Sequence, residues 1–503
     1  MTNTLFDALM ARHAGDDRPA LILPGGATLD HDGLYRLSGR LANLLTASGV
    51  GPGDRVAVQV AKSPEALALY LATLRAGAVF LPLNPAYTAA ELAYFIADAA
   101  PALLVCDPAI VAQRADFAPD ALRLLTLDAA GQGSLTEAAI RHPETQAPVP
   151  RAGHQLAAIL YTSGTTGRPK GAMLSHDNLL SNARVLADAW RFSCDDVLLH
   201  ALPIFHTHGL FVACNLSLLS GGAMIWLPRF DADEVLRLLP QATVMMGVPT
   251  FYTRLLDRPG LDREATARMR LFISGSAPLL AETHRAFEAR TGHVILERYG
   301  MTETNMTTSN PYDGPRRAGT VGRPLPGVSL RIVDAAGADV ERGQIGMIRV
   351  RGANVFKGYW QMPDKTAEDL DAEGWFTTGD LGMQDAEGHV TIVGRSKDLV
   401  ISGGLNIYPK EVEEAIDALQ EVLESAVIGV PHPDLGEATV AVLVPAPGTA
   451  PDPQEILAAL SDRLARFKLP RRVILADELP RNAMGKVQKA ALRQRHEGLF
   501  AKG

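Results

Sequence analysis

Residues 161–171, which read YTSGTTGRPKG, combine glycines, hydroxyl groups and cations in the way that a polyphosphate-binding loop requires. Glycines let the backbone bend tightly. Backbone N–H groups, hydroxyls and the cations Arg168 and Lys170 are groups that bind oxyanions. The same residue types also mark an ordinary turn between two strands. The segment lacks the pattern GxxxxGK followed by Ser or Thr, so an ADP-forming P-loop kinase or NTPase is the weaker alternative.

Three further segments have residues suited to the rest of a nucleotide. In YGMTET, Tyr299 suits stacking on a purine and Glu303 suits a hard cation, although a helix N-terminus with an acidic first turn also fits. The small residues 274–278 leave space for a planar ring. Asp380 suits two sugar hydroxyls and Arg395 a further sugar contact, against the alternatives of a type I turn aspartate and a surface arginine.

His206 and His208, in PIFHTHG, raise the question of a metal site. A zinc site needs three or four ligands, and no Cys, His or carboxylate partners follow at matching spacing. The pattern favours a polar wall that faces an acidic substrate.

Composition narrows the class of protein. The 503 residues carry a formal net charge of −8 without a basic run, which argues against a nucleic-acid partner. Three widely spaced cysteines give no disulfide framework, and the N-terminus lacks an apolar signal segment, so we expect a cytoplasmic protein. The uncharged stretch 209–228 contains polar residues and a Gly–Gly pair, which indicates a buried helix, a turn and a strand over 223–227 more than a membrane helix.

Apolar runs and helical patterns alternate through the first four hundred residues. We expect strands at 55–60, 79–82 and 103–106 and helices at 64–76 and 89–99, a rhythm typical of βαβ units in a mixed α/β fold. Shorter strands follow at 329–333, 346–351 and 389–393. The sequence predicts an N-terminal domain at 1–394 with a β-rich subdomain at about 321–394, a hinge at the charged turn 395–398, and an α+β domain at 399–503.

Five segments occur in a fixed order: YTSGTTGRPKG, YGMTET, WFTTGD, GRSKDLVISGG and PRNAMGK. Together they resemble the AMP-forming acyl-CoA synthetases of the adenylate-forming family, and the resemblance covers nearly the whole chain. It implies a large N-terminal domain of parallel-rich sheets and a small mobile C-terminal domain. It also implies that ATP, Mg²⁺ and coenzyme A take part in the reaction.

The resemblance assigns residues to each task. Lys486, Glu303, Thr302 and Lys170 would be catalytic, with Glu303 and Thr166 as Mg²⁺ ligands. The C-terminal domain would swing about Lys397 and withdraw Lys486 before coenzyme A reacts. The residues that would bind ATP or coenzyme A are Thr162, Ser163, Gly164, Thr165, Thr166, Ser276, Ala277, Pro278, Glu297, Arg298, Tyr299, Asp380, Arg395, Lys397, Gly403 and Gly404.

The loop that carries the lysine departs from the family pattern. It commonly reads TxSGK, whereas Asn482, Ala483 and Met484 precede Gly485 here. Because the glycine and the lysine are retained, we expect the difference to affect loop packing or regulation more than the chemistry. Regulation would involve a further partner, a protein lysine acyltransferase that acts on Lys486.

Within the family, PIFHTHGL, LPRF and LERYGMTETNM resemble the malonyl-CoA synthetases, including those that accept methylmalonate. The unreacted carboxylate of such a substrate needs a cation, for which we predict Arg229 with His206, while Thr207 and Met306 shape the space beside C2. Two alternatives are a short- or medium-chain monocarboxylate–CoA ligase and a non-enzymatic nucleotide sensor. A third, transfer of the acyl group to a carrier protein, is not expected because no carrier domain follows Gly503.

Overall fold

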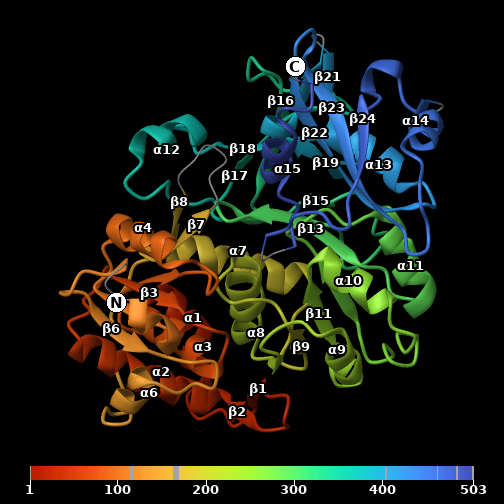
Figure 1. The fold of residues 1–503 in the computed structure, drawn as a ribbon. Coiled ribbons are helices and arrows are strands. Elements are labelled where there is room, and N and C mark those ends of the chain that lie inside the picture. The colour runs from red at the N-terminus through yellow and green to blue at the C-terminus, as the bar shows by residue number, and fades with distance from the viewer. Residues whose placement is uncertain are drawn as a thin grey trace. The chain divides into compact units, whose positions relative to one another are not determined.

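The computed structural model describes residues 2–113, 117–162, 169–402, 405–461, 463–482 and 485–500. Internal contacts divide the chain into two compact units (Figure 1). The first comprises Met1–Ser329 and Val350–Phe376, and the second comprises Leu330–Arg349 and Thr377–Gly503. Most of the β-rich segment therefore groups with the C-terminal residues in this division. The hinge at 395–398 stays a prediction.

The first unit contains a six-stranded sheet with the strand order β6-β5-β3-β4-β7-β8. Neighbours are parallel except β7 and β8, which form an antiparallel pair. The strands are β3 (Arg55–Gln59), β4 (Val79–Pro82), β5 (Leu103–Cys106), β6 (Arg123–Thr126), β7 (Leu156–Thr162) and β8 (Lys170–Ser175), and the helices around them are α1 (Thr4–Met10), α2 (His31–Ala47), α3 (Pro64–Arg75), α4 (Ala89–Ala99), α6 (Ser134–Ala139) and α7 (His176–Ala189). The βαβ rhythm predicted for residues 55–106 is confirmed.

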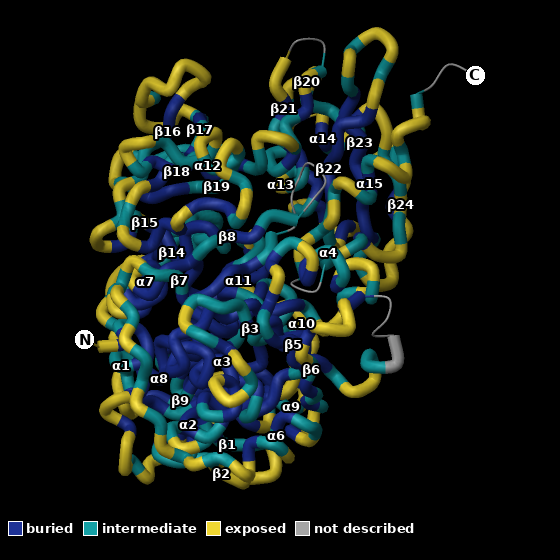
Figure 2. The backbone as a smooth tube through the Cα atoms, turned by 90° about the vertical axis from the view of Figure 1, so that its left-hand side faces the viewer, coloured by how far each residue is buried: buried dark blue, intermediate teal, exposed yellow. Residues whose placement is uncertain are grey.

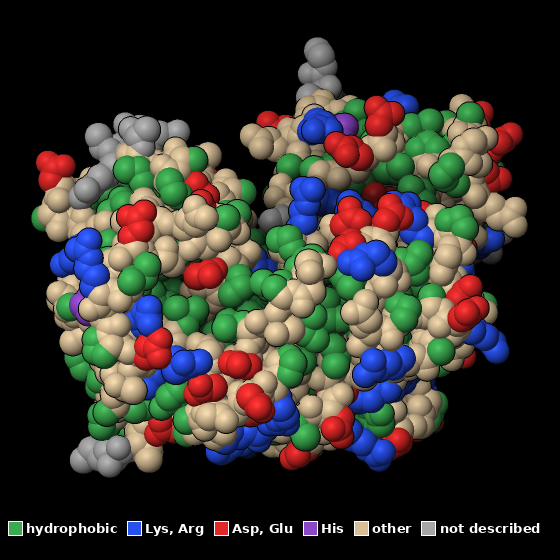
Figure 3. Space-filling model, turned by 90° about the horizontal axis from the view of Figure 1, so that it is seen from below, with side chains coloured by type: hydrophobic (Ala, Val, Ile, Leu, Met, Phe, Trp, Pro, Cys, Tyr) green, Lys and Arg blue, Asp and Glu red, His purple; other side chains and the backbone are tan. Residues whose placement is uncertain are grey.

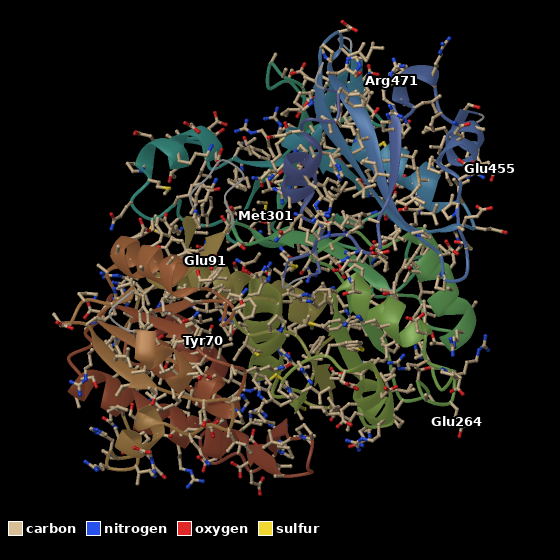
Figure 4. All side chains as sticks on the ribbon, in the orientation of Figure 1. Tyr70, Glu91, Glu264, Met301, Glu455 and Arg471 are labelled. Carbon is tan, nitrogen blue, oxygen red and sulfur yellow. The ribbon has the colours of Figure 1, made fainter. Side chains whose placement is uncertain are left out.

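Local sequence signals fix the helices that cover this sheet. Ser63 caps α3, whose first residue is Pro64, and Thr88 forms a capping box with Glu91 at the start of α4 (Figure 4). The connection from β3 leads to β4, its neighbour on one side in the sheet, whereas the connection from β4 leads back across β3 to β5 on the other side. Right-handed crossovers therefore place α3 and α4 on opposite faces (Figure 1).

A nine-stranded sheet forms the rest of the first unit, in the order β15-β14-β13-β12-β11-β9-β10-β1-β2. Its central strands are parallel and lie in the buried interior (Figure 2). The strands are β1 (Pro19–Ile22), β2 (Thr28–Asp30), β9 (Val197–His200), β10 (Ala223–Trp226), β11 (Val244–Gly247), β12 (Leu271–Ser274), β13 (Leu296–Met301), β14 (Asn305–Ser309) and β15 (Arg323–Pro324), and the helices are α8 (Asn215–Ser220), α9 (Ala232–Leu238), α10 (Pro249–Leu256), α11 (Ala281–Thr291) and α12 (Pro363–Asp369).

The second unit contains a four-stranded sheet and a five-stranded sheet. The four-stranded sheet consists of β16 (Ser329–Val333), β17 (Gly346–Arg351), β18 (Phe376–Gln384) and β19 (Val390–Arg395). The five-stranded sheet consists of β20 (Val400–Ser402), β21 (Leu405–Ile407), β22 (Val422–His432), β23 (Gly436–Pro445) and β24 (Arg472–Leu475), with the helices α13 (Pro409–Asp417), α14 (Pro453–Ser461) and α15 (Lys489–His496). The helix α15 is cationic, with Arg493, Arg495 and His496 in its last turn.

Within the described ranges, no helix has the length and apolar character needed to cross a membrane. The stretch 209–228 instead forms a π-helix (His208–Cys214), α8 and β10, with Gly221 in the left-handed conformation between the last two. Acidic and basic side chains lie interspersed on the face shown in Figure 3.

Candidate active site

The flanks of the glycine-rich loop are the two antiparallel strands β7 and β8, in which Thr162 is paired with Lys170. Ser163, Gly164, Thr165 and Thr166 lie outside the described residues. The Lys170 ammonium lies 4.1 Å from the centre of the Tyr359 ring and 3.5 Å from the Asp369 carboxylate. The lysine at the end of the loop thus lies next to a carboxylate and an aromatic face.

Glu303 lies in the turn that joins β13 to β14, just after Met301 (Figure 4). The alternative of a helix N-terminus is therefore wrong. Its side chain is buried at 5 % exposure, and one carboxylate oxygen accepts a hydrogen bond from the Tyr359 hydroxyl at 3.1 Å. Asn354 donates to the Thr304 carbonyl at 2.7 Å, which anchors the turn from behind. Thr302 is half-buried in the same turn.

Arg298 on β13 is a buried cation. It is 3 % exposed, and its Nε and Nη2 atoms have no hydrogen-bond partner among the residues that the structure describes. The guanidinium lies so close to Gly275 that a Cβ there would be 2.4 Å from Cζ. Burial lowers the pKa of Arg298 to about 9, which leaves it charged at neutral pH.

Two polar groups lie near Arg298. The Ser276 hydroxyl is 3.2 Å from Nδ1 of His208, and Nε2 of the buried His208 has no hydrogen-bond partner among the described residues. Burial and the neighbouring Arg298 charge lower the pKa of His208 well below its usual value, so the ring is neutral. Ser276 also adopts a left-handed conformation with φ of 72°, which marks the loop after β12 as strained.

The other predicted acyl-pocket residues differ in burial. Thr207 and Met306 are buried at 2 % exposure each, whereas His206 is half-buried and Arg229 is exposed. Asn182 fixes Met306 through both its backbone N–H and its carbonyl. Of the remaining predicted nucleotide residues, Glu297 is buried on β13 and Ala277, Pro278 and Tyr299 are half-buried or exposed.

The second unit brings together the predicted ribose residues and the predicted catalytic lysine. Asp380 on β18 pairs with Arg395 on β19 at 2.7 Å. Desolvation and the nearby Arg395 and Lys397 cations lower the pKa of Lys486 to about 8, and Asp380 offsets part of this effect.

Asn482 and Arg481 shape the loop before Lys486. The Asn482 side chain accepts a hydrogen bond from the Lys486 N–H at 3.0 Å, and the Asn482 N–H donates to the Lys486 carbonyl at 2.9 Å. Arg481 donates to the Gly485 carbonyl at 2.6 Å and pairs with Glu424. Asn482, one of the departures from the family pattern, therefore closes the loop. Ala483, Met484, Gly403 and Gly404 lie outside the described residues.

Sequence reasoning missed Tyr359 and Asp369. They lie more than fifty residues from Glu303 and almost two hundred from Lys170, and nothing in their local sequence marks them as polar partners. Backbone hydrogen bonds of residues 354–360 hold Tyr359 at the site, and Asp369 lies at the end of α12, which follows that segment.

One group of potential metal ligands lies elsewhere in the first unit: His13, Asp16 and His31, whose ligand atoms lie within 4.8 Å of one another. Both Asp16 oxygens already accept hydrogen bonds from Arg18, at 2.9 and 2.7 Å, and Nε2 of His13 is 2.8 Å from the Leu218 carbonyl. We interpret this group as a structural ion-pair network.

Comparison with known proteins shows the family of the chain. Residues 8–360 match the model of the AMP-binding enzyme family, and residues 411–486 match that of the AMP-binding enzyme C-terminal domain. An indoleacetate–CoA ligase from Aromatoleum aromaticum is 39 % identical over 96 % of both chains. A malonate–CoA ligase from Arabidopsis thaliana is 34 % identical over 88 % of this chain and 78 % of its own.

The fold agrees with that of solved relatives. The crystal structure of ATP-bound MatB from Rhodopseudomonas palustris has a TM-score of 0.97 and 56 % identity, and the match covers 99 % of this chain and 100 % of that one. The predicted mixed α/β fold with a large N-terminal and a small C-terminal domain is confirmed. The chain belongs to the AMP-binding enzyme family and is an ATP-dependent acyl-CoA ligase.

Proposed function

We propose that the chain activates malonate and methylmalonate, forming an acyl-adenylate and pyrophosphate and then the coenzyme A thioester and AMP. The observation that carries the proposal is Arg298, a buried guanidinium whose Nε and Nη2 groups have no partner among the described residues. An unpaired buried charge is costly, and a carboxylate is the ligand that a guanidinium binds in a bidentate way. A dicarboxylate brings one carboxylate to react and a second one to bind.

The surroundings of Arg298 suit a small polar acid. His208 and Ser276 supply neutral hydrogen-bonding groups beside the cation. Thr207, next to His208 in the sequence, and Met306, eight residues after Arg298, are both buried. Arg229, for which the sequence predicted this role, is exposed. An exposed cation loses little when unpaired, so Arg298 is the stronger candidate and Arg229 stays a prediction.

Adenylation requires an anion to approach a polyanion. The substrate carboxylate attacks the α-phosphorus of ATP, a new C–O–P linkage forms, and pyrophosphate leaves with the electron pair of the broken P–O bond. Lys170 and Lys486 supply positive charge that stabilises the phosphoryl oxygens, and Asp380 with Arg395 holds the ribose hydroxyls. The product is a mixed anhydride whose leaving group is AMP.

Glu303 fits Mg²⁺, because a carboxylate is the kind of ligand that this hard cation takes, and this one is buried and oriented by a hydrogen bond from the Tyr359 hydroxyl. Glu303 would hold the ion, which supplies charge neutralisation at the phosphates when bound. The other predicted ligand, Thr166, lies outside the described residues.

In the second half-reaction the thiol of coenzyme A attacks the acyl carbon and AMP leaves. No phosphoryl transfer occurs in this step, so the proposed role of Lys486 ends with adenylation. Gly403 and Gly404 remain the predicted contacts of coenzyme A.

The test is to measure AMP and acyl-CoA formed from malonate, methylmalonate, acetate and a longer fatty acid by the wild type and by Arg298→Met. We expect the wild type to use the two dicarboxylates, and the variant to lose at least roughly 10²-fold in kcat/KM for them. Arg229→Met tests the other candidate, and loss of malonate turnover in this variant alone would assign the unreacted carboxylate to Arg229.

Two outcomes would overturn the proposal. Preference of the wild type for acetate or a fatty acid would make the chain a monocarboxylate–CoA ligase of the same family. Unchanged malonate turnover in Arg298→Met would remove this guanidinium from the acid site.

A further inference from the structure

Residues 354–360 form a strap that is bonded to two parts of the nucleotide site. The Phe356 N–H donates to the carbonyl of Glu303 at 2.8 Å, and the Trp360 N–H donates to the carbonyl of Gly171 at 2.7 Å. The strap thus connects the turn that carries Glu303 with the strand that begins at Lys170. These contacts are entirely within the first unit.

Tyr359 is the side chain of this strap that contacts both charged residues. Its hydroxyl donates to Glu303 at 3.1 Å, and its ring lies 4.1 Å from the Lys170 ammonium. The side chain is buried at 3 % exposure.

The geometry points to Tyr359 as a positioning residue for adenylation, which fixes the Glu303 carboxylate and the Lys170 ammonium relative to each other. This inference rests on the proposed function. Tyr359 touches neither reacting atom; it acts through the two residues that bind the ion and the phosphates.

The physical reason lies in what each partner needs. A glutamate carboxylate can rotate, and a lysine ammonium sits on a flexible four-carbon stem. The Tyr359 hydroxyl donates to one oxygen of Glu303 and helps to hold the carboxylate in one orientation, while the ring face and Asp369 restrict Lys170. The rigid ring of Tyr359 therefore restricts both side chains before MgATP binds, which lowers the conformational entropy lost on binding.

The two contacts of Tyr359 can be separated by mutation. Tyr359→Phe keeps the ring beneath Lys170 and removes the hydrogen bond to Glu303, whereas Tyr359→Leu removes both. Tyr70→Phe is the matched control, since Tyr70 is another fully buried tyrosine of the same unit, with its hydroxyl 3.0 Å from Asn215 (Figure 4).

The experiment measures MgATP binding by calorimetry in the absence of acid, together with the Mg²⁺ dependence of adenylation and the thermal unfolding of each variant. We expect Tyr359→Phe to raise the Mg²⁺ concentration for half-maximal rate about tenfold, the size of one hydrogen bond to a charged group. Tyr359→Leu should also weaken MgATP binding at saturating Mg²⁺. Tyr70→Phe should leave both quantities unchanged.

The results distinguish this inference from the proposed function. If the wild type forms AMP from malonate but Tyr359→Phe shows the wild-type Mg²⁺ requirement and MgATP affinity, the positioning role is wrong and the function stands. If Tyr70→Phe shifts the Mg²⁺ requirement as much as Tyr359→Phe, the effect is structural and the inference is overturned. If the wild type uses no dicarboxylate but the Mg²⁺ shift occurs, the acid assignment fails and the positioning role stands.

Discussion

Two buried arginines of the first unit differ in what the protein offers to their guanidinium groups. Arg75, at the end of α3, donates to the carbonyls of Gln146 and Tyr35 at 2.8 and 2.9 Å and lies over the Tyr35 ring. Arg298 is also buried, but its Nε and Nη2 atoms have no hydrogen-bond partner among the described residues. Burial lowers the pKa of both side chains.

On the proposed function, the difference separates cations that hold the fold together from cations that bind a ligand. The hydrogen bonds that Arg75 donates to Gln146, Tyr35 and Ser38 all lie within one unit, so its charge is used by the folded chain itself. The proposal implies that a bound anion offsets the cost of burying Arg298. The lysines of the second unit divide in the same way, since Lys489 pairs with Glu413 at 2.5 Å, while no ion pair of Lys486 is present in the described part of that unit.

The largest test of this division is at Lys486. We expect Lys486→Ala to lose roughly 10²–10³-fold in the rate of adenylation, the usual effect of removing one oriented transition-state donor. Thioester formation from a supplied acyl-adenylate should survive, because that step forms no new phosphoryl bond. Pyrophosphate release and thioester formation, measured separately, give the two rates.

Lys489→Ala is the matched control, three residues along the chain. It removes a lysine that is paired with Glu413 and should change adenylation little. Equal damage to both half-reactions in Lys486→Ala, or similar losses in the two variants, would contradict the proposed role of Lys486.

The next test compares stability at the two arginines. Arg75→Met leaves buried carbonyls without donors, and we expect the free energy of unfolding to fall by about 3 kcal/mol. Arg298→Met removes an unpaired buried charge, and we expect the free energy of unfolding to stay the same or rise by about 1 kcal/mol. Denaturant unfolding of both variants, followed by a probe in the first unit, measures the difference. Equal destabilisation would show that Arg298 is a structural residue and that the comparison is wrong.

The elements were predictable where hydrophobic periodicity and caps agree. The strands β4, β5, β16 and β17 and the helix α4 have the bounds that the sequence predicts, because apolar runs between turn residues leave few alternatives. The YGMTET segment was ambiguous because an acidic residue after a glycine fits either a helix start or a turn. Asn305, which has a left-handed φ of 48°, belongs to the hairpin of β13 and β14. The pairing of these two strands is what selects the turn over the helix.

The site was predictable where function is local in sequence and not where it depends on pairing between distant segments. The motifs named Lys170, Glu303, Asp380, Arg395 and Lys486. The motifs did not show that Arg229 is exposed and Arg298 is buried, because burial of Arg298 depends on the packing of β13 against the loop after β12. Tyr359 was missed for the same reason.

The smallest expected effect is a pH dependence that arises from the surroundings of Lys486. An ordinary lysine has a pKa near 10.5, and here desolvation together with Arg395 and Lys397 lowers the pKa to about 8. The charged form is the one that stabilises phosphoryl oxygens, so the rate of adenylation should fall as pH rises through about 8, by about tenfold at one pH unit above the pKa. Lys486→Arg keeps its charge over this range, so whatever activity it retains should show no such fall, whereas Lys489→Arg should follow the wild-type profile. A wild-type profile that is flat up to about pH 10 would mean that neither burial nor the neighbouring cations lower the pKa of Lys486. A fall that persists in Lys486→Arg would assign the pH dependence to another group.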